Sequence, residues 1–132
     1  MLDTGVLVAS ERGRSAVMVD TIDRDDDVVI AAVTVAELRT GIELAGARQR
    51  PGRTDFLVRV LETLPVAPYD VEVAEAHGRL LAHTHRAGAK RGAHDLIIAA
   101  TAVATRRTLV TTDRSARFQD LPGVDCVVIS QL

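Results

Sequence analysis

The sequence is poor in aromatic residues and in cysteine, and each shortage excludes a class of function. Of its 132 residues only Phe56, Tyr69 and Phe118 are aromatic. A platform of aromatic rings that stacks unpaired bases is therefore not expected. Cys126 is the only cysteine, which excludes an internal disulfide and a cysteine-rich zinc site. The functions that remain need neither base stacking nor paired or clustered cysteines.

The sequence also lacks a large excess of positive charge and a long apolar run. Its 16 Lys and Arg residues nearly balance its 18 Asp and Glu residues, for a formal net charge of −2. Contact with nucleic acid has to be local, because phosphate neutralisation needs clustered cations. No apolar stretch approaches the ~20 residues that span a bilayer, and the start lacks the order of a signal peptide. We therefore expect a soluble, cytoplasmic protein.

Length and apolar patterning predict one α/β domain over residues 1–132. Apolar residues make up 47% of the chain, and no Pro/Gly/Ser-rich tract interrupts it. Runs rich in Val and Ile alternate with longer helical patterns, which is typical of a largely parallel sheet with helical connections. We expect five strands, one that ends near Asp3 and four over residues 27–33, 66–68, 108–112 and 124–130.

Helical patterns fill the segments between these strands. They cover residues 15–22, 34–49, 54–64, 70–86 and 94–106. The apolar spacing predicts buried side chains at Phe56, Leu57, Val60, Leu61, Leu64, Val73, Leu80 and Leu81. Gly88 is predicted to end the fourth of these helices. The fifth is apolar nearly all round, so we expect it in the interior with Asp95 in its first turn.

An acidic run, DRDDD at residues 23–27, precedes the second strand. Adjacent like charges are tolerated in water, so we interpret this run as a solvated turn. A calcium-binding loop is the alternative. The run lacks the alternating ligand order, the central glycine and the closing glutamate of such a loop, which favours the solvated turn.

Four acidic residues stand where apolar runs give way to turns or helix starts. They are Asp3 in LDTGVLVA, Glu37 in VTVAELRTG, Asp95 in GAHDLIIAA and Asp113 in TLVTTDRSARF. Each has a structural reading. Glu37 fits a capping box with Thr34, and the other three fit helix starts or a turn after a strand. Taken singly, each acid is more often structural than catalytic.

The predicted topology favours a common site for these acids. The carboxyl ends of parallel strands meet at one edge of a sheet, and residues just after them share a crevice. Carboxylates that lie close together repel one another unless a cation or a proton neutralises them. Oxygen ligands without sulfur suit Mg²⁺ or Mn²⁺, and two such ions about 4 Å apart assist phosphodiester hydrolysis. The sequence therefore predicts a metal-dependent phosphodiesterase.

Four histidines, His77, His83, His85 and His94, offer a rival chemistry. Two imidazoles can cleave RNA without metal through attack by the 2′-hydroxyl, one as base and one as acid. Three of them lie along the helix predicted over residues 70–86, where surface histidines are ordinary. His94 precedes Asp95 and is interpreted as an outer contact of the acidic site. Phosphate loops, nucleophile elbows and dinucleotide fingerprints are absent.

The segments LDTGVLVA, VTVAELRTGIEL, HDLIIAATA and LVTTDRSARFQDLPGV, in this order and spacing, resemble the PIN-domain ribonucleases, in particular the VapC toxins of bacterial toxin–antitoxin pairs. The resemblance spans nearly the whole chain. It implies a three-layer sandwich with a five-stranded parallel sheet flanked by helices, and an endoribonuclease that depends on Mg²⁺ or Mn²⁺. By the family pattern, the matching metal-binding acids are Asp3, Glu37, Asp95 and Asp113, and Thr112 matches the hydroxyl that supports them.

The resemblance also implies partners. VapC-like proteins usually form homodimers and are silenced by a small VapB-like antitoxin that blocks the acidic pocket. The helical pattern around residues 34–64 offers apolar surface that such a partner could cover. Transfer RNA and ribosomal RNA are the substrates expected from the family, and Arg91, Arg114 and Arg117 are our candidates for RNA contact. A PIN-like module that binds RNA or protein without cleaving is the alternative.

Overall fold

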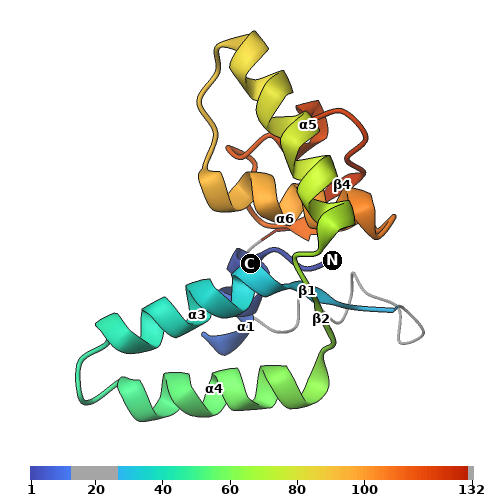
Figure 1. Cartoon of the computed structure of the whole chain (residues 1–132). Coiled ribbons are helices and arrows are strands. Elements are labelled where there is room, and N and C mark those ends of the chain that lie inside the picture. Colours follow the sequence, from blue (N-terminus) through green and yellow to red (C-terminus); the bar gives the residue numbers. More distant parts are fainter. Residues whose placement is uncertain (13–26, 131–132) are drawn as a thin grey trace.

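The computed structural model describes residues 1–12 and 27–130. The helix expected over residues 15–22 and the acidic residues 23–26 lie outside the described residues. The elements in chain order are α1 (Thr4–Glu11), β1 (Ile30–Ala31), α3 (Ala32–Leu44), α4 (Arg50–Thr63), β2 (Val66–Ala67), α5 (Val71–Ala87), α6 (Ala93–Ala104), β3 (Leu109–Thr111), the 3₁₀ helix η1 (Phe118–Asp120) and β4 (Cys126–Val128) (Figure 1).

The strands are short and parallel. β1 pairs with β2, and β3 pairs with β4. Leu2 joins the two pairs, because it forms parallel bridges to Ile30 of β1 and to Val110 of β3. The order across the sheet is therefore β2, β1, Leu2, β3, β4. The predicted count of five strands is not confirmed, since the described residues form four strands. In place of the strand that we expected to end near Asp3, Leu2 alone forms bridges.

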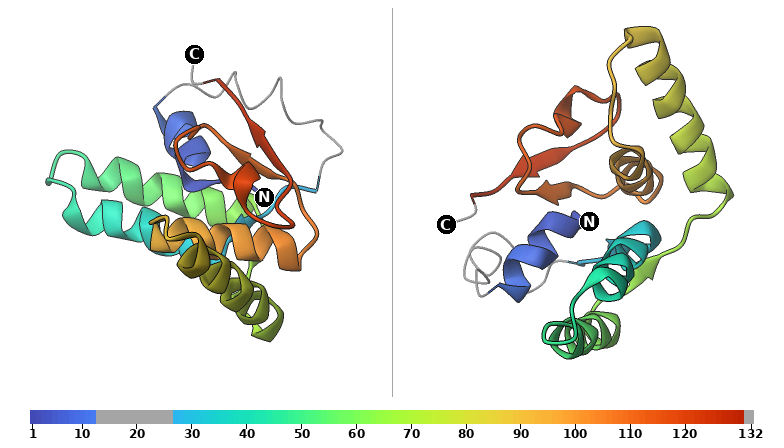
Figure 2. Two further views of the ribbon diagram at one scale, coloured as in Figure 1. Left: turned by 90° about the horizontal axis from the view of Figure 1, so that it is seen from above. Right: turned by 90° about the vertical axis from the view of Figure 1, so that its left-hand side faces the viewer.

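Helices cover both faces of this sheet. Side chains alternate between the faces of a strand, and Leu2 and Ile30 pack into a core with α1, α3 and α4. Their neighbours Met1, Val29 and Ala31 pack into a second core with α5 and α6. In Figure 1 the β1–β2 pair accordingly lies between α3 and α4 below and α5 and α6 above. In the right-hand view of Figure 2, α6 is seen end-on beside the strands, with α5 on its outer side.

Helix α1 is an element that the sequence did not predict. It begins at Thr4, directly after Asp3, whose Oδ1 accepts a hydrogen bond from the Thr4 amide at 2.9 Å and caps the helix. Val6 and Leu7 are buried in the core that α1 shares with α3 and α4. The chain therefore turns from the centre of the sheet directly into a helix, and Asp3 stands at the junction.

Helix α3 begins earlier than predicted, and the capping-box reading of Thr34 and Glu37 is wrong. Its N-cap is Ala31, which offers no side-chain hydrogen bond. Thr34 lies inside the first turn and is buried. The residues that we expected to extend the second strand to position 33 start the helix instead. This places Glu37 one turn into α3, where its carboxylate is available for contacts outside the helix.

The outer helices bury narrower apolar stripes than their spacing predicts. The predicted side chains that are buried or half-buried are Phe56, Leu57, Val60, Leu64, Val73 and Leu80. Leu61 and Leu81 are both 47% exposed. The reason is that α4 packs mainly against α3, and α5 mainly against α6, so each is covered on one side only. Gly88 ends α5 in the left-handed conformation at φ 66°, as predicted.

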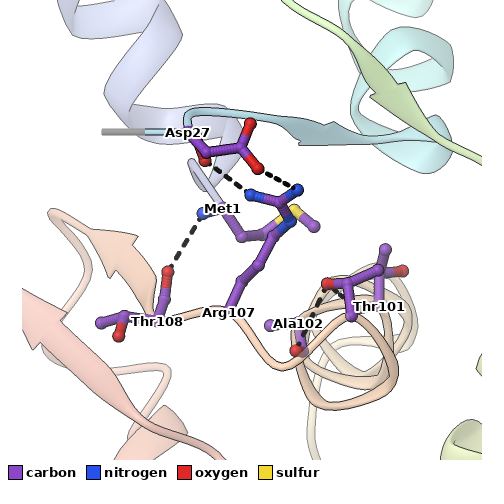
Figure 3. A network of polar contacts seen from close by, with 7 residues as sticks. Met1, Asp27, Thr101, Ala102, Arg107 and Thr108 are labelled. Carbon is purple, nitrogen blue, oxygen red and sulfur yellow. Dashed lines mark hydrogen bonds and ion pairs between the residues drawn. The ribbon is translucent and has the colours of Figure 1, made fainter. Parts of the chain in front are cut away.

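Helix α6 is the most buried helix, as its composition predicted. The chain leaves it through Arg107, whose guanidinium donates to the backbone oxygen and carboxylate of Asp27 at 2.6 and 2.8 Å (Figure 3). The amino group of Met1 donates to the Thr108 oxygen at 3.0 Å. These contacts tie the segment before β1 and the start of the chain to the start of β3. Within residues 1–12 and 27–130, no helix has the length and apolar character needed to cross a bilayer.

Candidate active site

A cavity of about 530 Å³ is lined by all four acids that the sequence singled out. Asp3 follows Leu2, Glu37 comes from α3, Asp95 from the first turn of α6 and Asp113 from the segment after β3. We call this the acidic cavity. Its other lining residues are Thr4, Gly5, Val8, Ala9, Arg12 and Thr112. The structure thus brings four distant carboxylates to one place.

Asp3 is the most buried of these acids, at 7% exposure. Its Oδ1 accepts the Thr4 amide, and its Oδ2 accepts the Thr111 hydroxyl at 2.7 Å. Burial raises the pKa of Asp3, the two hydrogen bonds oppose this shift, and the charges of Glu37 and Asp113 add to it. The hydrogen bonds fix the orientation of the carboxylate. Each oxygen keeps an acceptor position for a cation.

Thr111 is a site residue that sequence reasoning missed. It is fully buried. Its Oγ1 donates to Asp3 and accepts the amide of Asp113 at 3.0 Å, so it connects two of the four acids. Thr112, the residue matched by the family pattern, lines the cavity beside Gly5. A signal was present, because strand alternation puts Thr111 on the buried face of Leu109, where a hydroxyl needs a partner.

Glu37 is held by hydroxyl groups rather than by its own helix. Its Oε1 accepts the Thr4 hydroxyl at 2.8 Å, and Thr4 Oγ1 lies 3.0 Å from Thr34 Oγ1. Its Oε2 lies 3.7 Å from His94 Nδ1, which places this histidine at the outer contact that we expected. Thr4 and Thr34 were not predicted as site residues. They orient Glu37 toward the acidic cavity.

Asp95 lies in the first turn of α6. Burial raises its pKa, the charges of Asp3, Asp113 and Glu37 raise it further, and His94 opposes them. The helix begins after Gly92, where a Cβ atom would lie 2.8 Å from Asp95 Oδ2. A glycine at this position therefore leaves room for the Asp95 carboxylate. The charges of three neighbouring carboxylates therefore act on Asp95, in agreement with its place in the acidic cavity.

Asp113 organises the turn that follows β3. Its Oδ1 accepts hydrogen bonds from the Ser115 amide at 2.9 Å, the Ser115 hydroxyl at 2.5 Å and the Ala116 amide at 3.2 Å. One oxygen of the carboxylate thus fixes the loop, and the other oxygen accepts no such bond from the described residues. We call residues 113–117 the Asp113 loop.

Of the three arginines predicted to contact RNA, Arg114 and Arg117 lie in this loop and Arg91 contacts it from outside. Arg91 Nη1 donates to the Ala116 oxygen at 2.7 Å and to the Arg117 oxygen at 3.1 Å. The Arg117 side chain pairs with Asp120 at 2.6 Å. Arg114 is exposed. The guanidinium of Arg91 therefore holds the Asp113 loop, and RNA contact by the three arginines stays a prediction.

Sequence comparison decides the family. The profile described as PIN domain matches residues 1–123. The chain belongs to the PIN-domain family. Ribonuclease VapC5 of Mycobacterium tuberculosis is 36% identical over 132 residues, which cover 98% of this chain and 92% of that protein. The resemblance to PIN-domain ribonucleases of the VapC type is thereby confirmed.

Solved structures agree with this PIN-domain fold. A member of the VapBC family of toxin–antitoxin systems, VapBC-5 from Mycobacterium tuberculosis, matches with a TM-score of 0.74 at 27% identity, covering 96% of this chain and 95% of that chain. VapBC2 from Rickettsia felis, crystallised with a DNA fragment from its promoter, matches with a TM-score of 0.87 at 21% identity, covering 98% of both chains. The second likeness concerns the fold alone.

The acids of this PIN domain fit a hydrated divalent ion. In the part of the chain that the structure describes, no three Asp, Glu, His or Cys side chains lie close enough to surround one ion. Mg²⁺, however, keeps several waters and is commonly held by one or two carboxylates. The donor set consists of carboxylate oxygens, which such ions prefer. Burial, and to a smaller extent the neighbouring carboxylates, raise the pKa values of Asp3 and Asp95, and a bound cation would favour the ionised form of both.

The histidines of this PIN domain are poorly placed for metal-free cleavage. His77, His83 and His85 lie on α5, and none of the three lines the acidic cavity. His77 Nδ1 is instead hydrogen bonded to the Tyr69 hydroxyl at 2.8 Å. His94 alone among the histidines contacts one of the four acids. A mechanism with paired imidazoles would need a second histidine at this position.

Proposed function

We propose that this PIN domain is an endoribonuclease that depends on Mg²⁺ or Mn²⁺ and acts as the toxin of a type II toxin–antitoxin pair. The observation that carries the proposal is the acidic cavity, where Asp3, Glu37, Asp95 and Asp113 meet. The relative named Ribonuclease VapC5 supports the reaction class. The proposed substrate is transfer RNA or ribosomal RNA, cut by hydrolysis of a phosphodiester.

The residues of the site have different roles in this proposal. Asp3 and Asp95 would hold the first of one or two ions, because both line the acidic cavity and the charges of neighbouring carboxylates act on both. Glu37 and Asp113 would hold waters or a second ion. Thr111 keeps Asp3 in position through its hydroxyl. When bound, the ion supplies polarisation of the phosphoryl oxygen and acidifies a water for attack.

The proposed partners are a VapB-like antitoxin and a second copy of the chain. Structural relatives include a VapBC toxin–antitoxin member, which supports the antitoxin. Apolar side chains on α3 and α4 are uncovered, since Leu44 is 82% exposed, Val58 48% and Leu61 47%. These residues fit the surface expected for a protein partner over residues 34–64. Because transfer RNA and ribosomal RNA are cytoplasmic, the proposal also places the protein in the cytoplasm.

Induction in a bacterial host without an antitoxin tests the function. We expect growth arrest and discrete cuts in total RNA, and we expect purified protein to lose activity in EDTA and regain it with Mn²⁺. Asp95→Asn should abolish both arrest and cleavage. Asp55→Asn, which removes an exposed carboxylate on α4 outside the acidic cavity, is the matched control and should behave like the wild type.

Other outcomes would contradict the proposal. Arrest that survives Asp95→Asn, with no cut in any RNA, indicates a module that binds without cleaving. Cleavage that continues in EDTA and leaves 2′,3′-cyclic phosphate ends indicates attack by the 2′-hydroxyl with imidazole groups as acid and base. Hydrolysis by an activated water leaves no cyclic phosphate, so the end groups separate the two mechanisms.

A further inference from the structure

A second cavity, of about 520 Å³, adjoins the acidic cavity. The two share Thr4, Val8, Arg12 and Glu37 as lining residues. Beyond this border the charge changes sign. The acidic cavity has four carboxylates and one arginine in its lining, whereas the second cavity is lined by Arg12, Arg48 and Arg53 together with Glu11 and Glu37. We call this second cavity the arginine groove.

Arg53 is oriented in the arginine groove by neutral partners. Its Nη1 donates to the Gly41 oxygen at 3.0 Å, and its Nη2 donates to Gln49 Oε1 at 3.3 Å. A guanidinium has five N–H donors, so three are still available. Neither Arg48 nor Arg53 forms an ion pair with any residue in 1–12 or 27–130. Their charges are therefore available to an anionic ligand.

The position of Arg53 relative to the four acids indicates which anionic group it could bind. Gly41, which Arg53 contacts, follows Glu37 by four residues on α3, and this corresponds to about 6 Å along the helix axis. The backbone oxygen that holds Arg53 is thus displaced from Glu37 by about one helical turn. Arg53 and Arg48 line the arginine groove and not the acidic cavity, so the backbone on one side of a phosphate that reacts among the four acids would run past them.

We propose that the arginine groove binds the RNA backbone that flanks the scissile phosphodiester, with Arg53 and Arg48 as its phosphate contacts. The proposal rests on the ribonuclease function proposed above. A chain with a net charge of −2 has no general attraction for RNA. The acidic cavity itself repels a polyanion. A cationic groove that begins at its border supplies the missing attraction and sets the direction in which the strand leaves the site.

Variants of the two arginines test the groove, with a labelled RNA oligonucleotide that spans a cut site mapped in induced cells. For Arg53→Gln we expect KM to rise about tenfold, while kcat stays within about twofold because the acids are untouched. The slope of log kcat/KM against log salt should fall by about 0.7, as for one lost contact to a single strand. Arg53→Lys keeps the charge and should retain the salt slope.

The Arg48→Gln variant distinguishes a loss of RNA contact from a disturbance of the fold. Arg53 contacts the end of α3, so its removal can disturb the fold, whereas Arg48 is exposed and has no hydrogen bond to any described residue. The same rise in KM and fall in salt slope is expected. Arg79→Gln is the control, because Arg79 is an exposed arginine on α5 that lines neither cavity, and its kinetics should match the wild type.

The outcomes distinguish this proposal from the proposed function. If the wild type cleaves no RNA, the ribonuclease function fails and the groove proposal fails with it. If the wild type cleaves but Arg48→Gln keeps the wild-type KM and salt slope, only the groove proposal is overturned. Unchanged RNA kinetics with weaker inhibition by the antitoxin would likewise overturn it, and would identify the groove as a protein contact.

Discussion

At the scale of single residues, the Thr111 hydroxyl is the contact on which the orientation of two acids depends. Thr111→Val keeps the shape of the side chain but leaves Asp3 Oδ2 without its donor and the Asp113 amide without its acceptor. Because the position is fully buried, we expect the free energy of unfolding to fall by about 1–3 kcal/mol in urea denaturation. We expect the Mn²⁺ affinity from calorimetric titration to fall about tenfold.

A buried threonine elsewhere provides the control for this prediction. Thr101 is also buried, but its hydroxyl donates to the Ile97 oxygen of its own helix at 2.7 Å. Thr101→Val should therefore leave the Mn²⁺ affinity unchanged. If Thr111→Val also bound Mn²⁺ with wild-type affinity, the hydroxyl would not be what orients Asp3.

A second residue-scale prediction concerns Asp95 in the metal-free protein. Burial and three neighbouring carboxylates raise its pKa, so its ionised form destabilises the fold at neutral pH. Asp95→Asn removes this charge. We expect the melting temperature in EDTA to rise by roughly 2–5 °C, although cleavage and stabilisation by Mn²⁺ are lost. A lower melting temperature in EDTA would show that the carboxylate is structural.

At the scale of elements, the Asp113 loop depends on the turn between α5 and α6. Arg91 from that turn donates to two carbonyl oxygens of the loop. With Arg91→Gln we expect the amides of Ser115 and Ala116 to exchange with deuterium about tenfold faster, because the loop opens more often. Hydrogen-exchange mass spectrometry of a peptide covering residues 112–120 measures this.

The neighbouring residue is the control for the loop. Lys90 carries the same charge, is exposed and forms no side-chain hydrogen bond with the described residues, so Lys90→Gln should leave exchange in the loop unchanged. Equal exchange rates in wild type and Arg91→Gln would mean that the bonds of Asp113 Oδ1 to its own loop suffice. The Mn²⁺ affinity of Arg91→Gln then should not change either.

Elements were predictable from sequence where periodicity is long or a stop residue is explicit. α5 and α6 begin and end within two residues of the prediction, since one ends at Gly88 and the other is apolar throughout. α1 was missed because its eight residues are too few for a clear period, and its start depends on the Asp3 cap. The Val and Ile run before α3 suggested a longer strand than β1, because residues 32 and 33 join the helix.

The acids of the site were predictable from the sequence, whereas the threonines that hydrogen bond to them were not. Strand ends and helix starts mark Asp3, Glu37, Asp95 and Asp113 in the sequence, since parallel strands share an edge. Thr111 supports Asp3 across 108 positions of the chain, and Thr4 supports Glu37 across 33. Such pairs depend on the final packing of side chains, which no local pattern encodes. The roles of the four acids in catalysis stay predictions.

At the scale of the whole molecule, the small net charge does not reflect how the charged residues are distributed. A formal charge of −2 suggests a neutral surface, yet four carboxylates line one cavity and three arginines line its neighbour. Metal at the first and phosphate at the second would each be attracted locally.

The PIN-domain match ends at residue 123, and the assignment of one domain to residues 1–132 stays a prediction.

The same arrangement predicts how the stability of the molecule depends on pH. Asp3 and Asp95 have pKa values raised above the ordinary 3.8, so between 3.8 and the raised values the folded state keeps protons that the unfolded state has lost. The free energy of unfolding of the metal-free protein should therefore decrease as pH rises through this interval. Mn²⁺ competes with these protons, so the rise in melting temperature that it causes should grow with pH over the same interval.

Thermal melts in EDTA and in Mn²⁺ across this pH range test the coupling, with Asp95→Asn as the reference. The variant lacks one of the two titrating groups, so its EDTA curve should depend less on pH, and its Mn²⁺ curve should lie close to its EDTA curve. A metal-free wild type that becomes more stable as pH rises through the interval would contradict the predicted direction of both shifts. Stabilisation by Mn²⁺ that is independent of pH would place the ion away from Asp3 and Asp95, because binding there has to displace their protons.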